Sequence, residues 1–115
     1  MPDKHPSRIA SNRRPRALVF AALGDGTRLA LVAKLCGGDP RSISQLTDGS
    51  NLTRQAITKH LRVLERAGFV RCVHAGRESR FQFNPEPIEG MKEYLDFVSA
   101  QWDQALARLK SFVEE

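Results

Sequence analysis

The spacing of hydrophobic residues predicts helices up to Gly68 and a different structure immediately after it. The expected helices are residues 14–23, a segment that Asp25 caps and that runs through Cys36, a short helix that Ser42 caps, and a helix that Thr53 caps and that runs to Ala67. Aspartate, serine and threonine suit these starts because their side chains accept hydrogen bonds from the free N–H groups of the first turn. In the second helix we expect Leu29, Val32, Ala33 and Leu35 to face the core.

After Gly68 apolar and polar residues alternate, as is typical of β-strands. Residues 69–74 and 79–83 are expected to form two strands joined by a short turn, and therefore an antiparallel hairpin. Phe81 and Phe83 share one face of the second strand and are expected to point to the core. The fold is thus predicted to be mainly α-helical, with about five helices and a small two-stranded hairpin.

A long last helix is expected from about Glu86 to Glu114. Its apolar residues recur at alternating intervals of three and four, which is the heptad pattern of a helix that packs along another helix. They are Ile88, Met91, Leu95, Val98, Trp102, Ala105, Leu109 and Phe112. A chain of this size cannot cover so long a stripe alone, so the pattern indicates a partner, although part of the stripe can pack on the domain's own core.

The length of 115 residues allows one domain. Residues 1–13 are expected to be a disordered basic arm, because they hold two prolines and no periodic apolar residues, and residues 14–115 are expected to be the folded domain. No apolar run approaches the roughly 20 residues of a membrane span, and the first residues lack the apolar block of a secretory signal. Two cysteines are too few for a disulfide scaffold, so we expect a reducing, cytoplasmic location.

Charge is distributed unevenly along the chain. Eighteen basic and 13 acidic residues give a net charge of +5. Residues 41–83 hold eight basic and three acidic side chains, whereas residues 84–115 hold three basic and seven acidic ones. An ordinary solvated surface would scatter both signs, so the basic middle indicates a module that binds a polyanion.

The predicted fourth helix carries the candidate chemistry. On a helical wheel it separates into an apolar face of Ile57, Leu61 and Leu64 and a polar face of Gln55, Thr58, Lys59, Arg62 and Arg66. Arg54, Gln55 and Thr58 lie near its N-terminal end, where a helix-turn-helix places its base readers. Arginine can bond guanine, and glutamine can bond adenine, in the major groove. A merely solvated face is the alternative, but such a face usually mixes in acids, and Glu65 is the only one here.

The segments on either side support this interpretation. The short helix after Ser42 and the helix after Thr53 are separated by a tight turn, which is the layout of a helix-turn-helix. The hairpin carries Arg71, Arg77 and Arg80. A basic hairpin beside a reading helix can contact phosphates or the adjacent minor groove.

Two segments resemble the arsenic-repressor (ArsR) family of winged helix-turn-helix regulators. Residues 52–70, LTRQAITKHLRVLERAGFV, resemble that family's recognition helix and the entry to its wing. Residues 23–28, LGDGTR, resemble its Leu-x-Asp-Pro-Thr-Arg motif, with Gly26 where proline is usual. The sequence Gly76-Arg77-Glu78 also matches a common wing tip.

This resemblance implies a bacterial or archaeal homodimeric repressor whose first and last helices form the dimer interface. The residues expected in that interface are Leu18, Leu95, Val98, Trp102 and Leu109. A two-fold axis between the recognition helices implies an inverted-repeat operator on double-stranded DNA, with half-sites roughly 10 bp apart or a multiple of that. The recognition helix and the wing, with Arg54, Gln55, Thr58, Lys59, Arg62, Arg77 and Arg80, are expected to contact it.

Sensing is the least determined property. Many family members bind metal through cysteines in the short third helix or through histidines in the last helix, and neither set is present. Asp96 and Asp103 share one side of the last helix, but two carboxylates alone make a poor transition-metal site. We therefore expect no metal and no cofactor. The chain looks most similar to a metal-independent branch of the family, and its inducer is unknown.

The cysteines and one histidine leave alternatives open. Cys36 and Cys72 could form a thiol redox switch, although small, partly buried apolar residues are the simpler interpretation. Cys72 and His74 share a strand face, a weak metal signal that needs a further ligand. His60 lies on the apolar side of its helix and is expected to be a hydrogen-bonded structural histidine.

A specific regulator is not the only function class that the sequence allows. An enzyme is not expected, because the sequence has no phosphate loop, no nucleophile with a partner base and no convergent carboxylates. The rivals are a winged helix that binds an acidic protein and a nucleoid-type protein that binds DNA without sequence preference. Gln55 favours sequence reading, because an amide adds little to non-specific attraction.

Overall fold

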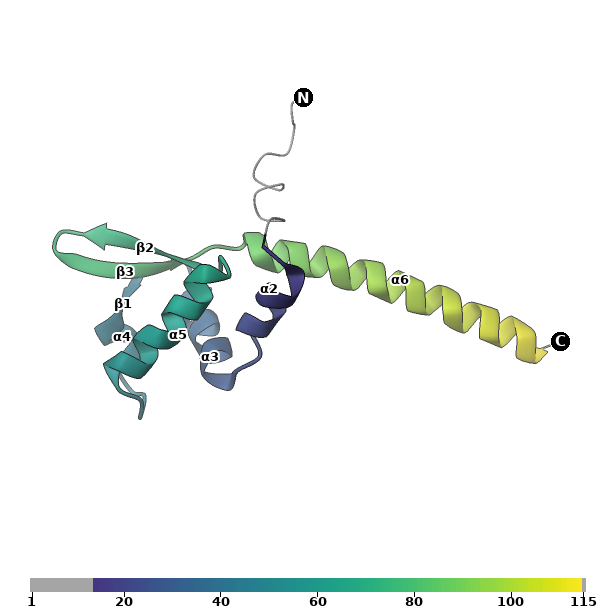
Figure 1. Ribbon diagram of the computed structural model, residues 1–115, viewed down its shortest axis with the longest axis horizontal. Coiled ribbons are helices and arrows are strands. Elements are labelled where there is room, and N and C mark those ends of the chain that lie inside the picture. The colour runs from purple at the N-terminus through teal and green to yellow at the C-terminus, as the bar shows by residue number, and fades with distance from the viewer. Residues whose placement is uncertain (1–13, 115) are drawn as a thin grey trace, which may run out of the picture.

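The computed structural model describes residues 14–114, so the predicted arm at residues 1–13 lies outside the described residues. The elements are α2 (Arg16–Ala22), α3 (Gly26–Leu35), β1 (Arg41–Ser42), α4 (Ile43–Thr47), α5 (Arg54–Arg66), β2 (Val70–Ala75), β3 (Glu78–Phe83) and α6 (Glu86–Glu114) (Figure 1). The two short helices α4 and α5, followed by the hairpin β2–β3, form a winged helix-turn-helix. The predicted fold class is confirmed, and each predicted helix and strand is present in the expected order, with boundaries that differ by one or two residues.

Side-chain caps fix where three of the helices begin. The Asp25 carboxylate accepts a hydrogen bond from the backbone N–H of Arg28 (3.1 Å) at the start of α3. Ser42 and Gln45 form a reciprocal capping box at the start of α4, with bonds of 2.9 and 3.1 Å. Thr53 accepts from the backbone of the first turn of α5. All three predicted caps are confirmed.

The sheet has a strand that the sequence did not reveal. We expected a two-stranded wing, but β1 pairs with β3, so the antiparallel sheet has three strands in the order β1-β3-β2. Arg41 lies opposite Phe81, and Ser42 lies opposite Arg80. A strand of two residues is too short to show an alternating pattern, and the buried Ser42 is at once the end of β1 and the cap of α4.

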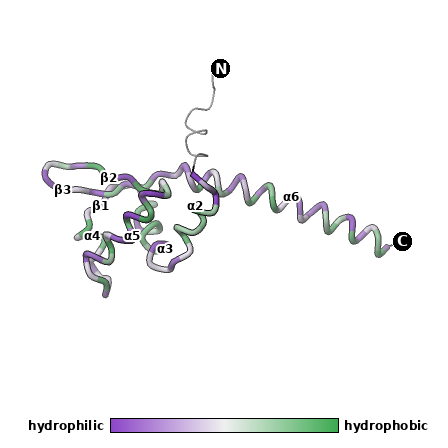
Figure 2. The backbone as a smooth tube through the Cα atoms, viewed as in Figure 1, coloured by the Kyte–Doolittle hydropathy of each residue, from purple (hydrophilic) through white to green (hydrophobic). Residues whose placement is uncertain are grey.

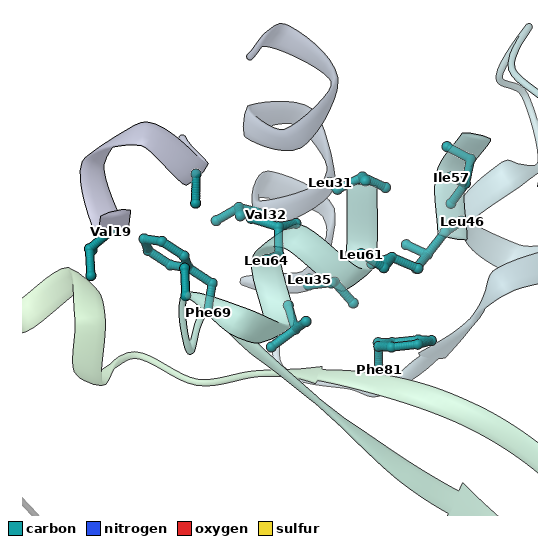
Figure 3. Packing of buried hydrophobic residues seen from close by; sticks show 13 residues of the cluster. Val19, Leu31, Val32, Leu35, Leu46, Ile57, Leu61, Leu64, Phe69 and Phe81 are labelled. Carbon is teal, nitrogen blue, oxygen red and sulfur yellow. The ribbon is translucent and has the colours of Figure 1, made fainter. Parts of the chain in front are cut away.

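One hydrophobic core joins α5 to the helices that precede it in the chain and to the wing that follows it. α5 contributes Ile57, Leu61 and Leu64, and the wing contributes Phe81 (Figure 3). The buried apolar set is Val19, Ala22, Leu31, Val32, Leu35, Leu46, Ile57, Leu61, Leu64, Ala67, Phe69, Val70 and Phe81. Phe83 packs against this core and is half-buried, as its strand face predicted.

The inner face of α3 differs from the prediction. Val32 and Leu35 are buried as expected, but Leu29 and Ala33 are exposed and Leu31 is buried instead. At about 100° per residue, Leu31, Val32 and Leu35 share one arc, and Leu29 and Ala33 lie on the other side of the helix. The prediction for those two residues was therefore wrong.

α6 leaves the body of the molecule and continues far beyond it (Figure 1). Only its beginning packs on the domain: the Tyr94 ring meets Phe20 edge-on at 5.8 Å and lies 4.4 Å beneath the Arg16 guanidinium. The Cα radius of gyration is 18.6 Å, whereas a compact domain of this length has about 13 Å. Among the described helices, none is long and apolar enough to cross a membrane.

Candidate nucleic-acid interface

α5 presents two chemically different sides. Its apolar residues Ile57, Leu61 and Leu64 are at most 2% exposed, so one side is sealed in the core. The other side holds the exposed residues Arg54, Gln55, Lys59, Arg62 and Arg66. The separation expected from the helical wheel is therefore present, and the cationic and amide tips face solvent rather than the molecule's interior.

The first turn of α5 is open to an incoming ligand. Thr53 satisfies one backbone N–H there, and the turn contains no acidic side chain. Within the part of the chain that the structure describes, the side chains of Arg54 and Gln55 hydrogen-bond to no other protein group. Because a helix N-terminus carries partial positive charge, this end combines free donors with an attraction for anions.

Two residues of the same side already have partners. The Thr58 hydroxyl donates to the carbonyl oxygen of Arg54 (2.8 Å), so its oxygen remains only as an acceptor. Arg62 pairs with Glu65 at 3.0 Å while 55% of its side chain stays exposed. An exposed ion pair is worth about 0–1 kcal/mol, so a stronger anion can displace Glu65.

The wing places its arginines on both sides of its turn. Gly76 adopts a φ of +65°, which glycine accepts without steric strain, and Arg77 follows it, exposed at the tip. Arg80 pairs with Glu78 at 2.9 Å, which neutralises part of its charge. Arg71 is exposed on β2. Arg77 is thus the wing cation best placed for a new partner.

The C-terminal end of α5 is held by Gly68, where the sequence predicts that the helix stops, and by an arginine that the sequence pattern did not reveal. Gly68 (φ +89°) closes the helix in a Schellman motif, in which Phe69 N–H bonds the Leu64 carbonyl oxygen at 2.9 Å. Arg14 donates from Nε to the carbonyl oxygen of Arg66 at 3.1 Å, and its guanidinium lies against Gly68 so closely that a side chain there would clash. Arg14 comes from 52 residues earlier in the chain, and no local pattern reveals such a contact.

His60 is a bonded structural histidine, as expected. Its Nδ1 lies 3.2 Å from Nη1 of Arg28 and 3.7 Å from Oδ2 of Asp25, and its side chain is 24% exposed. The backbone N–H of Arg28 is the main cause that lowers the pKa of Asp25, and the charges of His60 and Arg28 add to it. The start of α3 therefore meets the middle of α5 through polar side chains.

The residues predicted for a dimer interface lie largely in solvent in the single chain. Leu18 is 43% exposed, Leu95 52%, Trp102 63% and Leu109 58%, whereas Val98 is half-buried. The exposed apolar surface of α6 is wider than the predicted heptad stripe. Leu106 and Val113 are exposed beside the heptad stripe, and Phe97 is exposed on another side of α6.

The candidate sensing residues do not converge on a site. Cys36 is exposed, so the expectation that both cysteines are partly buried is wrong for this one, whereas Cys72 is half-buried against the core. Both thiols are free. Within residues 14–114, no group of three or more histidine, cysteine, aspartate or glutamate side chains could hold a metal ion. A cavity of about 170 Å³ lies between the starts of α2 and α6.

Comparisons with known proteins agree on one kind of protein. Residues 23–73 match a family model described as a helix-turn-helix domain. The chain is 37% identical, over 64% of its length and 86% of the relative, to the HTH-type transcriptional regulator YuzN of Bacillus subtilis. It is 31% identical, over 83% of its length and 85% of the relative, to an HTH-type transcriptional regulator of Mycobacterium tuberculosis.

The solved structures that this fold resembles are of the same kind of protein. An ArsR-like transcriptional regulator from Rhodococcus sp. RHA1 has a TM-score of 0.74 and 37% identity, covering 84% of this chain and 91% of that one. A homodimeric winged helix-turn-helix DNA-binding domain from Mycobacterium bovis has a TM-score of 0.59, covering 88% of this chain and 89% of that one. Its sequence identity is 18%, so this similarity supports the fold alone.

Proposed function

The chain belongs to the ArsR family of winged helix-turn-helix transcriptional regulators, and we propose that it is a homodimeric repressor that binds an inverted-repeat operator. The observation that carries this proposal is the composition of the open side of α5. Exposed arginine, lysine and glutamine side chains project there, while the opposite side of the helix is fully buried. A rigid helix with free donors on one side has the chemistry needed to read a major groove.

Base reading falls to the first turns of α5. Arg54 and Gln55 are exposed and uncommitted to other groups of the described chain, so their donors are available to guanine and adenine edges. Thr58 contributes less, because its hydroxyl proton is already donated to the Arg54 carbonyl oxygen. It offers an acceptor oxygen and a methyl group that can contact thymine.

The other basic side chains of α5 and the wing are expected to contact phosphates. Lys59 and Arg62 lie on the exposed side of α5, and Arg77 and Arg80 lie on the wing. Arg62 and Arg80 would exchange their glutamate partners for phosphate oxygens, which costs little at an exposed site. These contacts position the protein on the duplex without reading its sequence.

A second copy of the chain is the expected partner of α6. The exposed residues Leu95, Trp102 and Leu109 follow one stripe of a helix of 29 residues, about 44 Å long. A soluble protein rarely leaves so large an apolar surface in water, and a heptad stripe suits the same helix of another protomer. Leu18 and the half-buried Val98 would extend this interface.

The signal that releases DNA is not assigned to a metal. α4 has no cysteine and α6 has no histidine, so the ligand sets used by metal-sensing members are missing from the sequence. A redox role of the exposed Cys36 would require that a Cys36→Ser variant lose an oxidant response that the parent shows. We infer a metal-independent repressor that acts in the cytoplasm and catalyses no reaction.

Fluorescence anisotropy with two DNA duplexes tests the proposal. The protein should bind DNA from its own promoter region at least about 10³-fold more tightly than a random duplex of equal length. Arg62→Ala should weaken binding without loosening the dimer, and Gln104→Ala, which changes an exposed residue of α6, serves as the control. Equal affinity for both duplexes would refute a specific regulator and favour a nucleoid-type protein. Binding to neither would favour a protein-interaction module.

A further inference from the structure

One guanidinium joins α2 to α5. Arg28, in the first turns of α3, donates from Nε to the carbonyl oxygen of Ala22 at 2.6 Å and from Nη2 to that of Ala21 at 3.4 Å. Its third nitrogen, Nη1, lies 3.2 Å from Nδ1 of His60 in α5. The first two contacts hold the C-terminal end of α2, and the third reaches the proposed DNA-reading helix.

This bridge matters because the two helices have different main packing partners. α5 packs against α3, α4 and β2, whereas α2 packs against α6. Among residues 14–114, two polar links join α2, or the residues just before it, to α5. Arg28 reaches His60 in the middle of α5, and Arg14 reaches the Arg66 carbonyl oxygen at its end. The orientation of α5 relative to the proposed dimer helices is therefore set by the shared hydrophobic core together with these polar side chains.

The link at His60 depends on a proton. Nδ1 can accept a hydrogen bond from Arg28 only while it is unprotonated, with the ring proton on Nε2. A protonated ring has no acceptor and would carry a positive charge 3.2 Å from Arg28. It could instead donate to the Asp25 carboxylate, whose Oδ2 is 3.7 Å from Nδ1. Protonation thus exchanges the partner of His60 from Arg28 to Asp25.

Other charged groups near α5 do not interfere with this exchange. α4 carries no charged residue. Of the titratable and charged side chains of β2, Arg71 and His74 are exposed and Cys72 is half-buried against the core, and none of them forms an ion pair with His60. Among the described residues, Asp25 and Arg28 are the charged groups that meet the His60 ring. Both lie at the start of α3.

We propose that Arg28 and His60 are positioning residues for sequence-specific DNA binding, and that uptake of a proton by His60 reduces the discrimination between operator and random DNA. The inference rests on the proposed function. Base-reading side chains must be held within about 10–20° of their productive orientation, so a small rotation of α5 affects base contacts more than phosphate contacts. His60 never touches DNA in this account.

The test compares pH profiles of discrimination, measured as the ratio of dissociation constants for random and promoter duplexes. Histidine side chains titrate between about pH 5 and 8. In the parent, this ratio should fall about tenfold from pH 8 to pH 5.5. His60→Asn keeps an acceptor at the position of Nδ1 but cannot titrate, so its ratio should stay high and flat. His74→Asn is the matched control and should keep the parent's profile.

A flat profile in the parent, or the same fall in His60→Asn as in the parent, would overturn the inference. At pH 8, Arg28→Lys keeps the charge but cannot bridge three acceptors, so its ratio should drop about tenfold while affinity for random DNA holds. An unchanged ratio in folded Arg28→Lys would also contradict it. A parent that shows no discrimination even at pH 8 would instead refute the proposed function.

Discussion

α5 and α6 are both amphipathic helices, but they leave opposite sides in water. In α5 the apolar side is buried, with Leu61 and Leu64 at 0% exposure, and the cationic side is open. In α6 the apolar side is open, with Trp102 at 63% and Phe112 at 75% exposure. Figure 2 shows that apolar positions continue along α6 to its far end, well away from the body of the molecule.

The difference indicates what each helix still lacks. An open row of arginine, lysine and amide groups is well solvated, and the partner that it binds most favourably is a polyanion. An open row of leucine and aromatic side chains is poorly solvated, and the partner that it binds most favourably is another apolar surface. One domain thus presents two unsatisfied surfaces of different chemistry, which we assign to DNA and to a second copy of the chain.

The same substitution in the two helices should have different consequences. Leu61→Ala removes a fully buried side chain and should lower the free energy of unfolding by about 3 kcal/mol at any protein concentration. Leu109→Ala removes a side chain that is 58% exposed in the single chain, so it should act only through association. Denaturant unfolding at several protein concentrations separates the two. If Leu109→Ala lowered the free energy of unfolding equally at all protein concentrations, the contrast between α5 and α6 would be contradicted.

Trp102 should be the strongest single contributor to the proposed dimer. Trp102→Ala is expected to weaken association by about 2 kcal/mol, which is roughly a 30-fold rise in the dimer dissociation constant. Analytical ultracentrifugation measures that constant, and Asp103→Ala, a neighbouring exposed change, is the control. A chain that stays monomeric at all concentrations, or a Trp102→Ala variant that dimerises like the parent, would remove α6 from this role.

Lys59 should act through phosphate and not through sequence. Lys59→Gln is expected to weaken binding to promoter and random DNA alike, by about fivefold, because it removes one cation from the exposed side of α5. The slope of log affinity against log salt concentration should fall in magnitude by about one. A loss confined to the promoter duplex would show that Lys59 reads bases.

The smallest expected effect is the pH dependence of the α3 cap. The backbone N–H of Arg28 is the main cause that lowers the pKa of Asp25 in the folded chain, so this group stabilises the fold above its unfolded pKa and the contribution is lost as pH falls through the lowered value. Asp25→Asn keeps a good cap without the charge. The stability advantage of the parent over this variant should therefore shrink below about pH 4. A difference that is constant with pH would contradict the assignment.

The sequence pattern predicted the features that depend on interactions between residues close together in the chain. The caps at Asp25, Ser42 and Thr53, the two sides of α5 and the hairpin all follow from residues within one or two turns of each other. The missed features join distant segments. β1 exists only through its pairing with β3, and the Arg14 and Arg28 contacts span 52 and 32 residues. Whether Arg54 and Gln55 read bases is not encoded in either kind of pattern and stays a prediction.

The central claim is that the open side of α5 reads base edges in the major groove. It is tested most directly by replacing operator adenines one at a time with 7-deazaadenine, which lacks the N7 acceptor, and measuring binding of the parent and of Gln55→Ala. We expect one adenine in each half-site at which the parent loses about tenfold in affinity and Gln55→Ala loses nothing further. Full sensitivity of Gln55→Ala at that adenine, or a parent that is insensitive at every adenine, would contradict the claim.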